Sequence, residues 1–147
     1  MTGWAEFTDQ LASQLARMPD GVIITLSGAG RSVRYVQAQV LQLEDRIWAE
    51  FQGDAKLDDA AALNPSLMSE TGWQLPDRDH HGNWWVEVPW PASSSIYRQL
   101  ASMIVTGFRD HHHVPDATAL TYFAWNDETG EPFVELPLLG IPSRDRL

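Results

Sequence analysis

The sequence contains no cysteine, one lysine and no long hydrophobic run. The absence of cysteine excludes disulfide bonds, thiolate nucleophiles and cysteine-ligated zinc or iron–sulfur centres. No stretch approaches the roughly 18 consecutive apolar residues that a membrane-spanning helix needs. Residues 1–7 lead directly into an amphipathic pattern, without a basic segment followed by an apolar run. We therefore expect no signal peptide and a cytoplasmic location.

Basic residues are scarce, with 10 lysines and arginines against 20 aspartates and glutamates, and the formal net charge is −10. A surface with this charge repels phosphate backbones and anionic lipid headgroups. We therefore expect neither nucleic acid nor a membrane as a partner. The same charge keeps a protein with an adhesive surface in solution.

Tryptophan, in contrast, is abundant. An indole buries a large area but is rarely hidden completely, so we expect some of these side chains to be partly exposed. Exposed aromatic groups on an acidic protein indicate a contact surface, and the alternative is a large aromatic core. The seven residues are Trp4, Trp48, Trp73, Trp84, Trp85, Trp90 and Trp125.

Three segments have helical features. Apolar residues recur every three or four positions from Trp4 to Arg17, and Pro19-Asp20-Gly21 ends that pattern. Residues 58–71 form a second candidate, with a break at Asn64-Pro65. The third begins at a cap among the serines 93–95 and continues to about Asp110.

Strand patterns separate these helices. Their short connections predict an antiparallel meander, and the chain shows no alternation of single strands and helices that would indicate a parallel sheet. The predicted fold class is α+β, an antiparallel sheet with helices packed on one face, in the order α-βββ-α-β-α-ββ. We expect one domain over residues 1–147, with 143–147 as a loose tail. The predicted strands are residues 21–27, 32–41, 47–52, 83–89, 119–125 and 133–138.

Two of these strands have one apolar face and one mixed face. In the second strand, Tyr35 alternates onto the same face as two glutamines, and in the third, Trp48 shares a face with Glu50 and Gln52. Aromatic groups supply contact area and amides supply hydrogen bonds, a combination typical of peptide-binding surfaces. An ordinary solvent-exposed face with a few large residues is the alternative.

The five histidines are the main candidates for metal chemistry. His80-His81 lies in a predicted polar loop, and three consecutive histidines, 111–113, end the third helix. Adjacent residues do not share a face of an α-helix, so such a run is a poor metal clamp, and we expect solvated histidines. A site between the two clusters stays open, with Asp77, Asp79 or Asp110 as an oxygen ligand.

Other catalytic patterns are absent from the sequence. The serines 93–95 lack the surroundings of a nucleophile elbow, and Gly28-Ala29-Gly30 is followed by a strand where a phosphate-binding loop requires a helix. We predict no catalytic residues and no cofactor.

Short features occur along the chain in a characteristic order. They are an early tryptophan before Pro19-Asp20-Gly21, Arg34-Tyr35-Val36-Gln37, Ala49-Glu50, Gly53-Asp54, Thr71-Gly72-Trp73 with Pro76, Phe108-Arg109-Asp110 and Leu120-Thr121-Tyr122. With these features the chain resembles the actinobacterial YbjN-like proteins, which are related in fold to type III secretion chaperones, and the similarity covers most of residues 4–125. The resemblance implies an α+β chaperone-like protein that binds peptide segments of client proteins, often as a homodimer.

The leading hypothesis is therefore a non-catalytic module that binds a client protein or peptide segment through an apolar sheet surface or a sheet edge. The candidate anchors are Tyr35, Trp48, Trp85 and Trp90. A structural homodimer subunit and a histidine-dependent metal enzyme are the alternatives.

Overall fold

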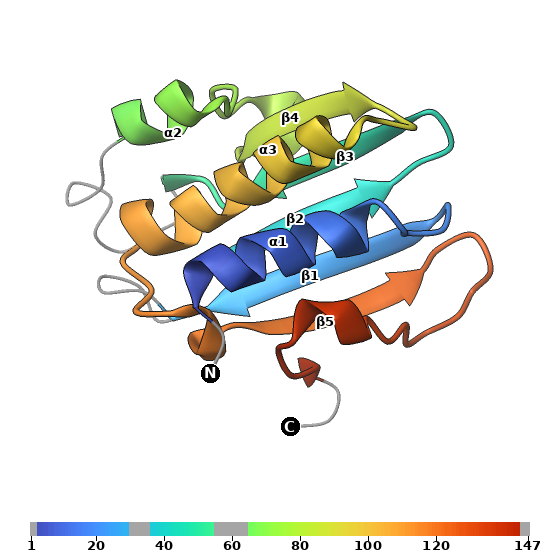
Figure 1. Ribbon diagram of the computed structural model, residues 1–147. Helices are drawn as coiled ribbons and strands as arrows, with labels where there is room; N and C mark the ends of the chain where they lie inside the picture. Colours follow the sequence, from blue (N-terminus) through green and yellow to red (C-terminus); the bar gives the residue numbers. More distant parts are fainter. Residues whose placement is uncertain (1–2, 30–35, 55–64, 145–147) are drawn as a thin grey trace.

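The computed structural model describes residues 3–29, 36–54 and 65–144. A five-stranded antiparallel sheet, in the order β4-β3-β2-β1-β5, carries α1 and α3 on one face (Figure 1). The predicted fold class is thereby confirmed, and the elements follow the predicted order from α1 to β5. Their bounds are α1 Trp4–Leu15, β1 Val22–Gly28, β2 Val36–Gln42, β3 Arg46–Phe51, α2 Pro65–Thr71, β4 Trp84–Pro89, α3 Ser94–Thr106 and β5 Thr121–Asn126.

The two long helices form where the sequence places their apolar stripes. Phe7, Leu11 and Leu15 of α1 are buried against the sheet. Ser93 caps α3 by accepting a hydrogen bond from the backbone N–H of Ile96. At Gly107 the α-helix changes to a π-helix, Gly107–His111. A Cβ atom on Gly107 would lie 2.5 Å from the Phe51 ring, so glycine allows this end of the helix to approach the sheet closely.

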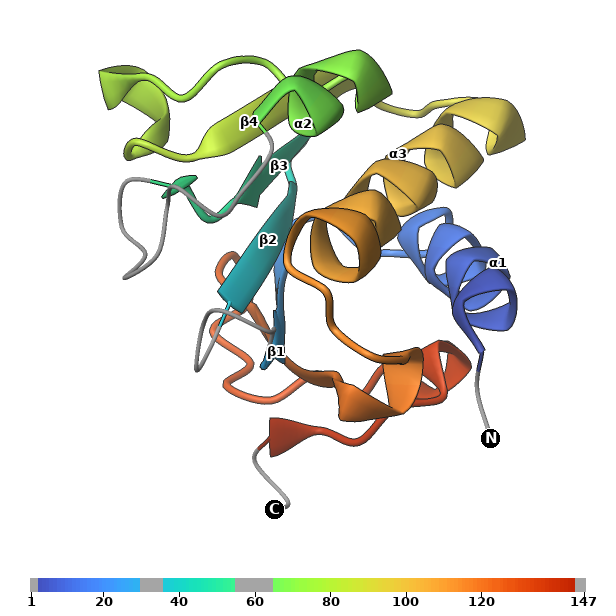
Figure 2. The ribbon, with the colours of Figure 1, turned by 90° about the vertical axis from the view of Figure 1, so that its left-hand side faces the viewer.

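Alternation along the strands divides the sheet into two faces. Residues such as Ile24, Ala38 and Ala49 point toward α1 and α3 and are almost fully buried. Most residues of β1 and β2 on the other face are partly exposed, as the alternating burial along these strands shows. Figure 2 shows α1 and α3 on one side of the sheet and the loop that precedes β4 on the other. We call the side without α1 and α3 the open face.

The predicted strand 133–138 is not formed. The segment runs beside β5, where the N–H of Val134 donates to the carbonyl of Ala124 at 2.9 Å, and it ends in a 3₁₀ turn, Pro137–Leu139. Pro132 and Pro137 lack N–H groups, so a continuous ladder cannot form there. The predicted turn between β5 and this segment is present, with the N–H of Gly130 donating to Asn126 O.

Several predictions fall at the limits of the described residues. Tyr35 lies outside them, and so do residues 58–64 of the predicted helix 58–71. The helix that is described begins at Pro65, which suits proline because the first turn needs no N–H donor. Ser143, placed in the expected tail, pairs with Tyr122 through a parallel bridge. Among the described helices, none has the length and apolar character to span a bilayer.

Candidate functional site

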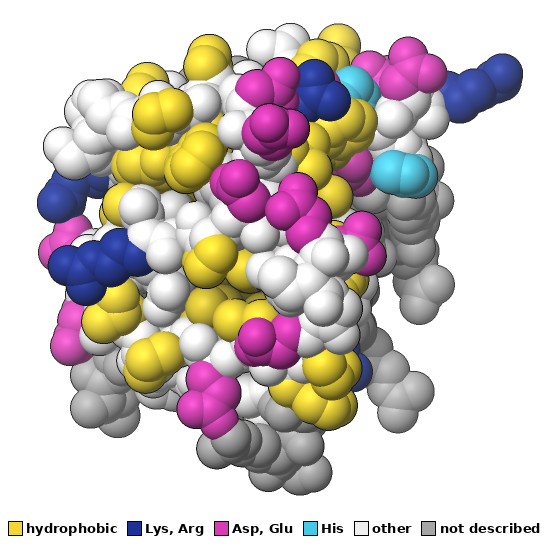
Figure 3. Space-filling model, turned by 90° about the vertical axis from the view of Figure 1, so that its right-hand side faces the viewer, with side chains coloured by type: hydrophobic (Ala, Val, Ile, Leu, Met, Phe, Trp, Pro, Cys, Tyr) yellow, Lys and Arg dark blue, Asp and Glu magenta, His cyan; other side chains and the backbone are white. Residues whose placement is uncertain are grey.

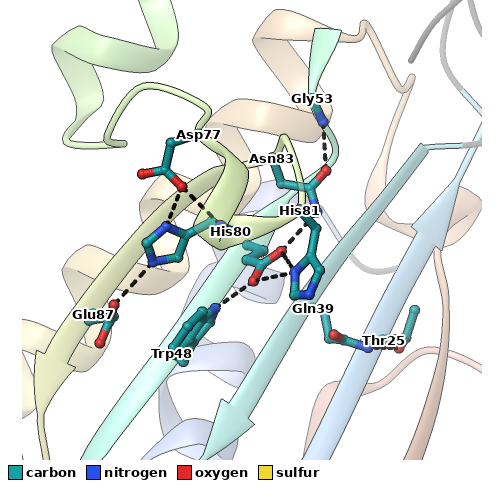
Figure 4. Close-up of polar contacts among 10 residues, drawn as sticks. Thr25, Gln39, Trp48, Gly53, Asp77, His80, His81, Asn83 and Glu87 are labelled. Carbon is teal, nitrogen blue, oxygen red and sulfur yellow. Dashed lines mark hydrogen bonds and ion pairs between the residues drawn. The ribbon is translucent and has the colours of Figure 1, made fainter. Parts of the chain in front are cut away.

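The open face contains a polar groove at its centre. A cavity of about 400 Å³ lies over β1, β2 and β3, and side-chain amides, a hydroxyl and one carboxylate surround it. Gln39 Nε2 donates to Thr25 Oγ1 at 3.3 Å (Figure 4). Gln52 Oε1 accepts from the backbone N–H of Gln37 at 3.1 Å. We call this cavity the amide groove, and its lining residues are Thr25, Gln37, Ala38, Gln39, Glu50, Gln52 and Asn83.

Glu50 is a buried carboxylate at the border of the amide groove, only 6% exposed. It accepts hydrogen bonds from Trp48 Nε1 at 2.5 Å, from Asn83 Nδ2 at 2.8 Å and from His81 Nδ1 at 3.1 Å. Charge-assisted hydrogen bonds of this kind offset the cost of burying a carboxylate. Glu50 therefore joins β3 to the loop before β4, and it supplies the negative charge of the groove.

His80 lies beside Glu50 between two tryptophans. Its ring stacks on Trp85, with a centroid separation of 3.8 Å and an interplanar angle of 1°, and its centroid is 4.8 Å from that of Trp48. Its Nδ1 donates to Asp77 at 2.7 Å and its Nε2 to Glu87 at 3.1 Å (Figure 4). Two carboxylate acceptors on one ring require both nitrogens to carry protons, so the geometry fits an imidazolium cation.

The electrostatic surroundings of His80 agree with this protonation state. Burial lowers the pKa of His80, but the hydrogen bonds and charges of Glu87 and Asp77 outweigh burial, and the pKa is raised above 6.5. The hydrogen bond from His80 also lowers the pKa of Asp77. His80 is thus a buried side chain paired with two carboxylates and not the solvated side chain that was predicted, whereas His81 is exposed.

An apolar row crosses the open face beside the amide groove. The strand register aligns Trp125 with Ile23, Ile23 with Leu41 and Leu41 with Trp48, and each of these side chains is partly exposed. At the β5 end the row continues through Phe123 to Phe133, which is 55% exposed. The open face therefore combines apolar area with hydrogen-bonding amides.

Both edges of the sheet are partly closed. Along β5, the N–H of Tyr122 donates to Pro142 O, and the carbonyl of Ala124 accepts from Val134. Along β4, Trp85 exchanges backbone hydrogen bonds with Gln74, and Pro89 has no N–H. These contacts shorten the edge that could pair with an added strand.

The structure brings together only part of the predicted anchor set. Trp48 and Trp85 lie on the open face on either side of His80, where Arg46 also lies 5.6 Å from the Trp48 ring. Trp90, in contrast, packs against the hydrophobic core and does not join them. Five tryptophans are partly exposed, as expected, whereas Trp73 and Trp84 are buried.

Sequence reasoning missed the partners of Glu50. Alternation placed Glu50 on the same face as Trp48, but its contacts with His81 and Asn83 span more than 30 positions of the chain. One signal was available in the sequence: Trp48 and Glu50 are two positions apart on the same face of a strand. A buried indole N–H usually finds an acceptor, so this spacing could have indicated their hydrogen bond.

A second histidine group lies on the helix side of the sheet. His111 and His112 are buried, and His111 Nε2 donates to Asp54 Oδ1 at 2.9 Å. Burial and the neighbouring His111 lower the pKa of His112 to about 4, so its ring is neutral at neutral pH. The prediction of solvated histidines is wrong here, because the π-helix turns both adjacent side chains inward. Only His113 of this run is exposed.

The two histidine clusters do not share partners. His80 contacts Asp77 and Glu87, while His111 contacts Asp54. The site between the two clusters that the sequence left open, with Asp77, Asp79 or Asp110 as the oxygen ligand, is therefore not seen among the described residues, and Asp110 instead pairs with Arg109 at 2.8 Å.

Comparison with protein families gave one match. The family model described as T3SS (YopN, CesT) and YbjN peptide-binding chaperone 3 matches residues 1–126. Searches of curated proteins and of solved structures gave no match.

Proposed function

Because the chain belongs to the family of T3SS and YbjN peptide-binding chaperones, we propose that it is a non-catalytic module that holds an extended client segment on the open face. The amide groove is the observation that carries this proposal. Its amides and hydroxyl can donate to and accept from a peptide backbone, and the apolar row beside it can receive alternate side chains.

Docking on the face is favoured over addition of a strand to an edge. The segment 131–142 already hydrogen-bonds to β5, and Gln74 already pairs with Trp85 of β4. The part of the β4 edge that could still pair with an added strand is a short stretch around Glu87, and this stretch ends at Pro89. A client that relied on main-chain pairing would have few partners there.

The charge of the protein indicates the kind of segment that fits. Glu50 lines the groove, and within the described residues no lysine or arginine lines it. Acidic side chains also lie among hydrophobic ones on the end of the molecule near the β2–β3 turn (Figure 3). Complementarity therefore favours a client segment in which apolar residues alternate with lysine or arginine.

Trp48 and Trp85 remain the proposed aromatic anchors. Both are partly exposed, Trp48 at the end of the apolar row and Trp85 opposite Glu50 on β4, and large aromatic groups of this kind supply much of the affinity at protein interfaces. Each also packs against His80, so replacing either one would disturb the loop before β4 as well as the surface. A substitution inside the groove gives a cleaner test.

The proposal can be tested by selecting binders from a displayed library of random 12-residue peptides. We expect the enriched peptides to alternate apolar with basic residues. Gln39→Arg places a cation and extra bulk in the groove, and we expect it to weaken the selected peptides at least tenfold. Gln99→Arg makes the same change on the exposed side of α3 and serves as the matched control.

Equal affinity of the Gln39→Arg and Gln99→Arg proteins would remove the open face from the proposal. Enrichment of acidic peptides would overturn the charge argument while leaving the location intact. Both proteins should be compared at two salt concentrations, because an ionic contribution weakens as salt rises.

The homodimer implied by the resemblance is a second part of the proposal. If two copies met through their open faces, the Glu50 carboxylates and the surrounding acidic groups would approach each other, which is unfavourable. We therefore propose that any dimer leaves the amide groove accessible. Light scattering of the parent and of Gln39→Arg tests this: a dimer that dissociates in the variant would place the open face in the dimer interface instead.

A further inference from the structure

The end of α3 and the end of β3 bring three metal-ligating side chains together. Asp54 follows β3, while His111 and His112 lie where the π-helix ends. One ligand atom from each residue can be chosen so that all three lie within 4.8 Å of one another. We propose that Asp54, His111 and His112 bind a divalent transition-metal ion, Zn²⁺ in the first instance.

An independent observation at His112 points to a ligand. Its side chain is 2% exposed, yet within the described residues neither ring nitrogen has a hydrogen-bond partner, and Nδ1 of His111 has none either. Buried polar atoms in native proteins are nearly always paired, so an imidazole with two unpaired nitrogens requires an explanation. Coordination of an ion by one nitrogen provides it.

The donor set selects the class of ion. Two imidazoles and one carboxylate suit Zn²⁺ and its transition-metal neighbours, whereas Mg²⁺ and Ca²⁺ prefer sites built only from oxygen. Trp84 Nε1 donates to Asp54 Oδ1 at 3.3 Å and so orients the carboxylate. The ring of His112 stacks on Phe51 with an interplanar angle of 15°, which gives the site an apolar wall.

The geometry requires a small adjustment. Zn–N and Zn–O bonds are about 2.0–2.2 Å long, so the ligand atoms of a tetrahedral site lie about 3.4 Å apart. The longest separation here is at most 4.8 Å, so it must shorten by no more than about 1.4 Å. His112 can supply this movement, because no hydrogen bond within the described residues holds its ring.

The proposed site lies apart from the amide groove. Three protein ligands leave one tetrahedral position for water, and the ion would join the helix layer to the sheet. This inference is independent of peptide binding, since none of its ligands lines the groove.

The test uses the full chain without an affinity tag, freed of metal with a chelator and titrated with ZnCl₂ in a calorimeter. We expect one equivalent to bind. CoCl₂ should give the intense visible absorption bands of four-coordinate cobalt. Asp54→Asn and His112→Leu should each weaken binding at least tenfold and remove these bands. His113→Ala, a change at the exposed neighbour in the same run, should bind as the parent does.

Failure of both ions to bind, or equal loss of binding in His113→Ala, would overturn the proposal. Six-coordinate cobalt bands would do so as well, since they indicate loose surface binding. Circular dichroism establishes that each variant is folded. Should His112→Leu not fold, Asp54→Asn carries the test alone, because Asp54 is only partly buried.

Discussion

Asn83 Nδ2 donates a 2.8 Å hydrogen bond to the buried carboxylate of Glu50, and this contact fixes the loop before β4 onto the middle of β3. The same asparagine accepts from the backbone N–H of Gly53 at 3.0 Å. One side chain thus positions both the border of the amide groove and the end of β3. The shape of the open face depends on this loop as much as on the strands.

Replacing Glu50 by glutamine should destabilise the protein. Glutamine has nearly the same shape, but its NH₂ group would face the N–H donors of Trp48, His81 or Asn83. We expect a loss of about 1–3 kcal/mol in the free energy of unfolding, measured by urea denaturation. Glu70→Gln, at an exposed position of α2, is the control and should stay within about 0.5 kcal/mol of the parent. Similar effects of the two changes would show that the Glu50 contacts contribute little.

Gly53→Ala should disrupt the docking of the loop before β4. A Cβ atom at this position would lie 1.9 Å from the carbonyl oxygen of Gly82, a distance that backbone atoms cannot tolerate. We expect a loss of about 1–3 kcal/mol, in the range of overpacking substitutions, and faster amide hydrogen exchange over residues 77–83. Gly3→Ala, where no atom lies within 4 Å of the added methyl group, is the matched control. Unchanged exchange in Gly53→Ala would contradict the close approach.

The pKa of His80 should lie above the ordinary histidine value of 6.5. Its pKa is raised because Glu87 and Asp77 accept from its two nitrogens, and Arg46, which pairs with Glu87 at 3.5 Å, is the nearby cation. A raised folded-state pKa means that the stabilisation is fully present below pH 6.5 and is lost as the pH rises through the raised value. NMR titration of the histidine ring protons measures this directly.

The Glu87→Gln variant tests whether Glu87 raises the pKa of His80. It removes one charged acceptor, so we expect the pKa of His80 to fall toward 6.5 and the variant to lose about 1–3 kcal/mol at pH 6. The difference in free energy of unfolding between parent and variant should shrink above the raised pKa. A difference that grows with pH would mean that His80 is neutral in the folded protein.

Much of the fold could be predicted because local patterns and long-range packing agree. Alternation in the second and third strands gave the correct buried face, and the serine cap and apolar stripe placed α3 within a few residues. The segment 133–138 failed as a strand because Pro132 precedes it and Pro137 lies within it, and neither can donate an N–H to a ladder, although its side chains alternate acceptably.

The sites were harder to predict, since their residues come from distant parts of the chain. Burial of His80 depends on tryptophans of two different strands, and no local pattern around residues 76–82 indicates it. Burial of His111 and His112 depends on a π-helix, whose wider turn overrides the rule that adjacent residues face different directions. Tyr35, a proposed anchor, lies outside the described residues, so its role in binding stays a prediction.

The most direct test of the central claim follows the indole N–H resonances of the seven tryptophans while a selected peptide is added to the ¹⁵N-labelled protein. If the client segment binds on the open face, the signals of Trp48, Trp85 and Trp125 shift, and those of the buried Trp73 and of Trp90 on the core side stay in place. Shifts confined to Trp73, Trp90 or Trp4 would contradict the account, because they would place the peptide against the helices.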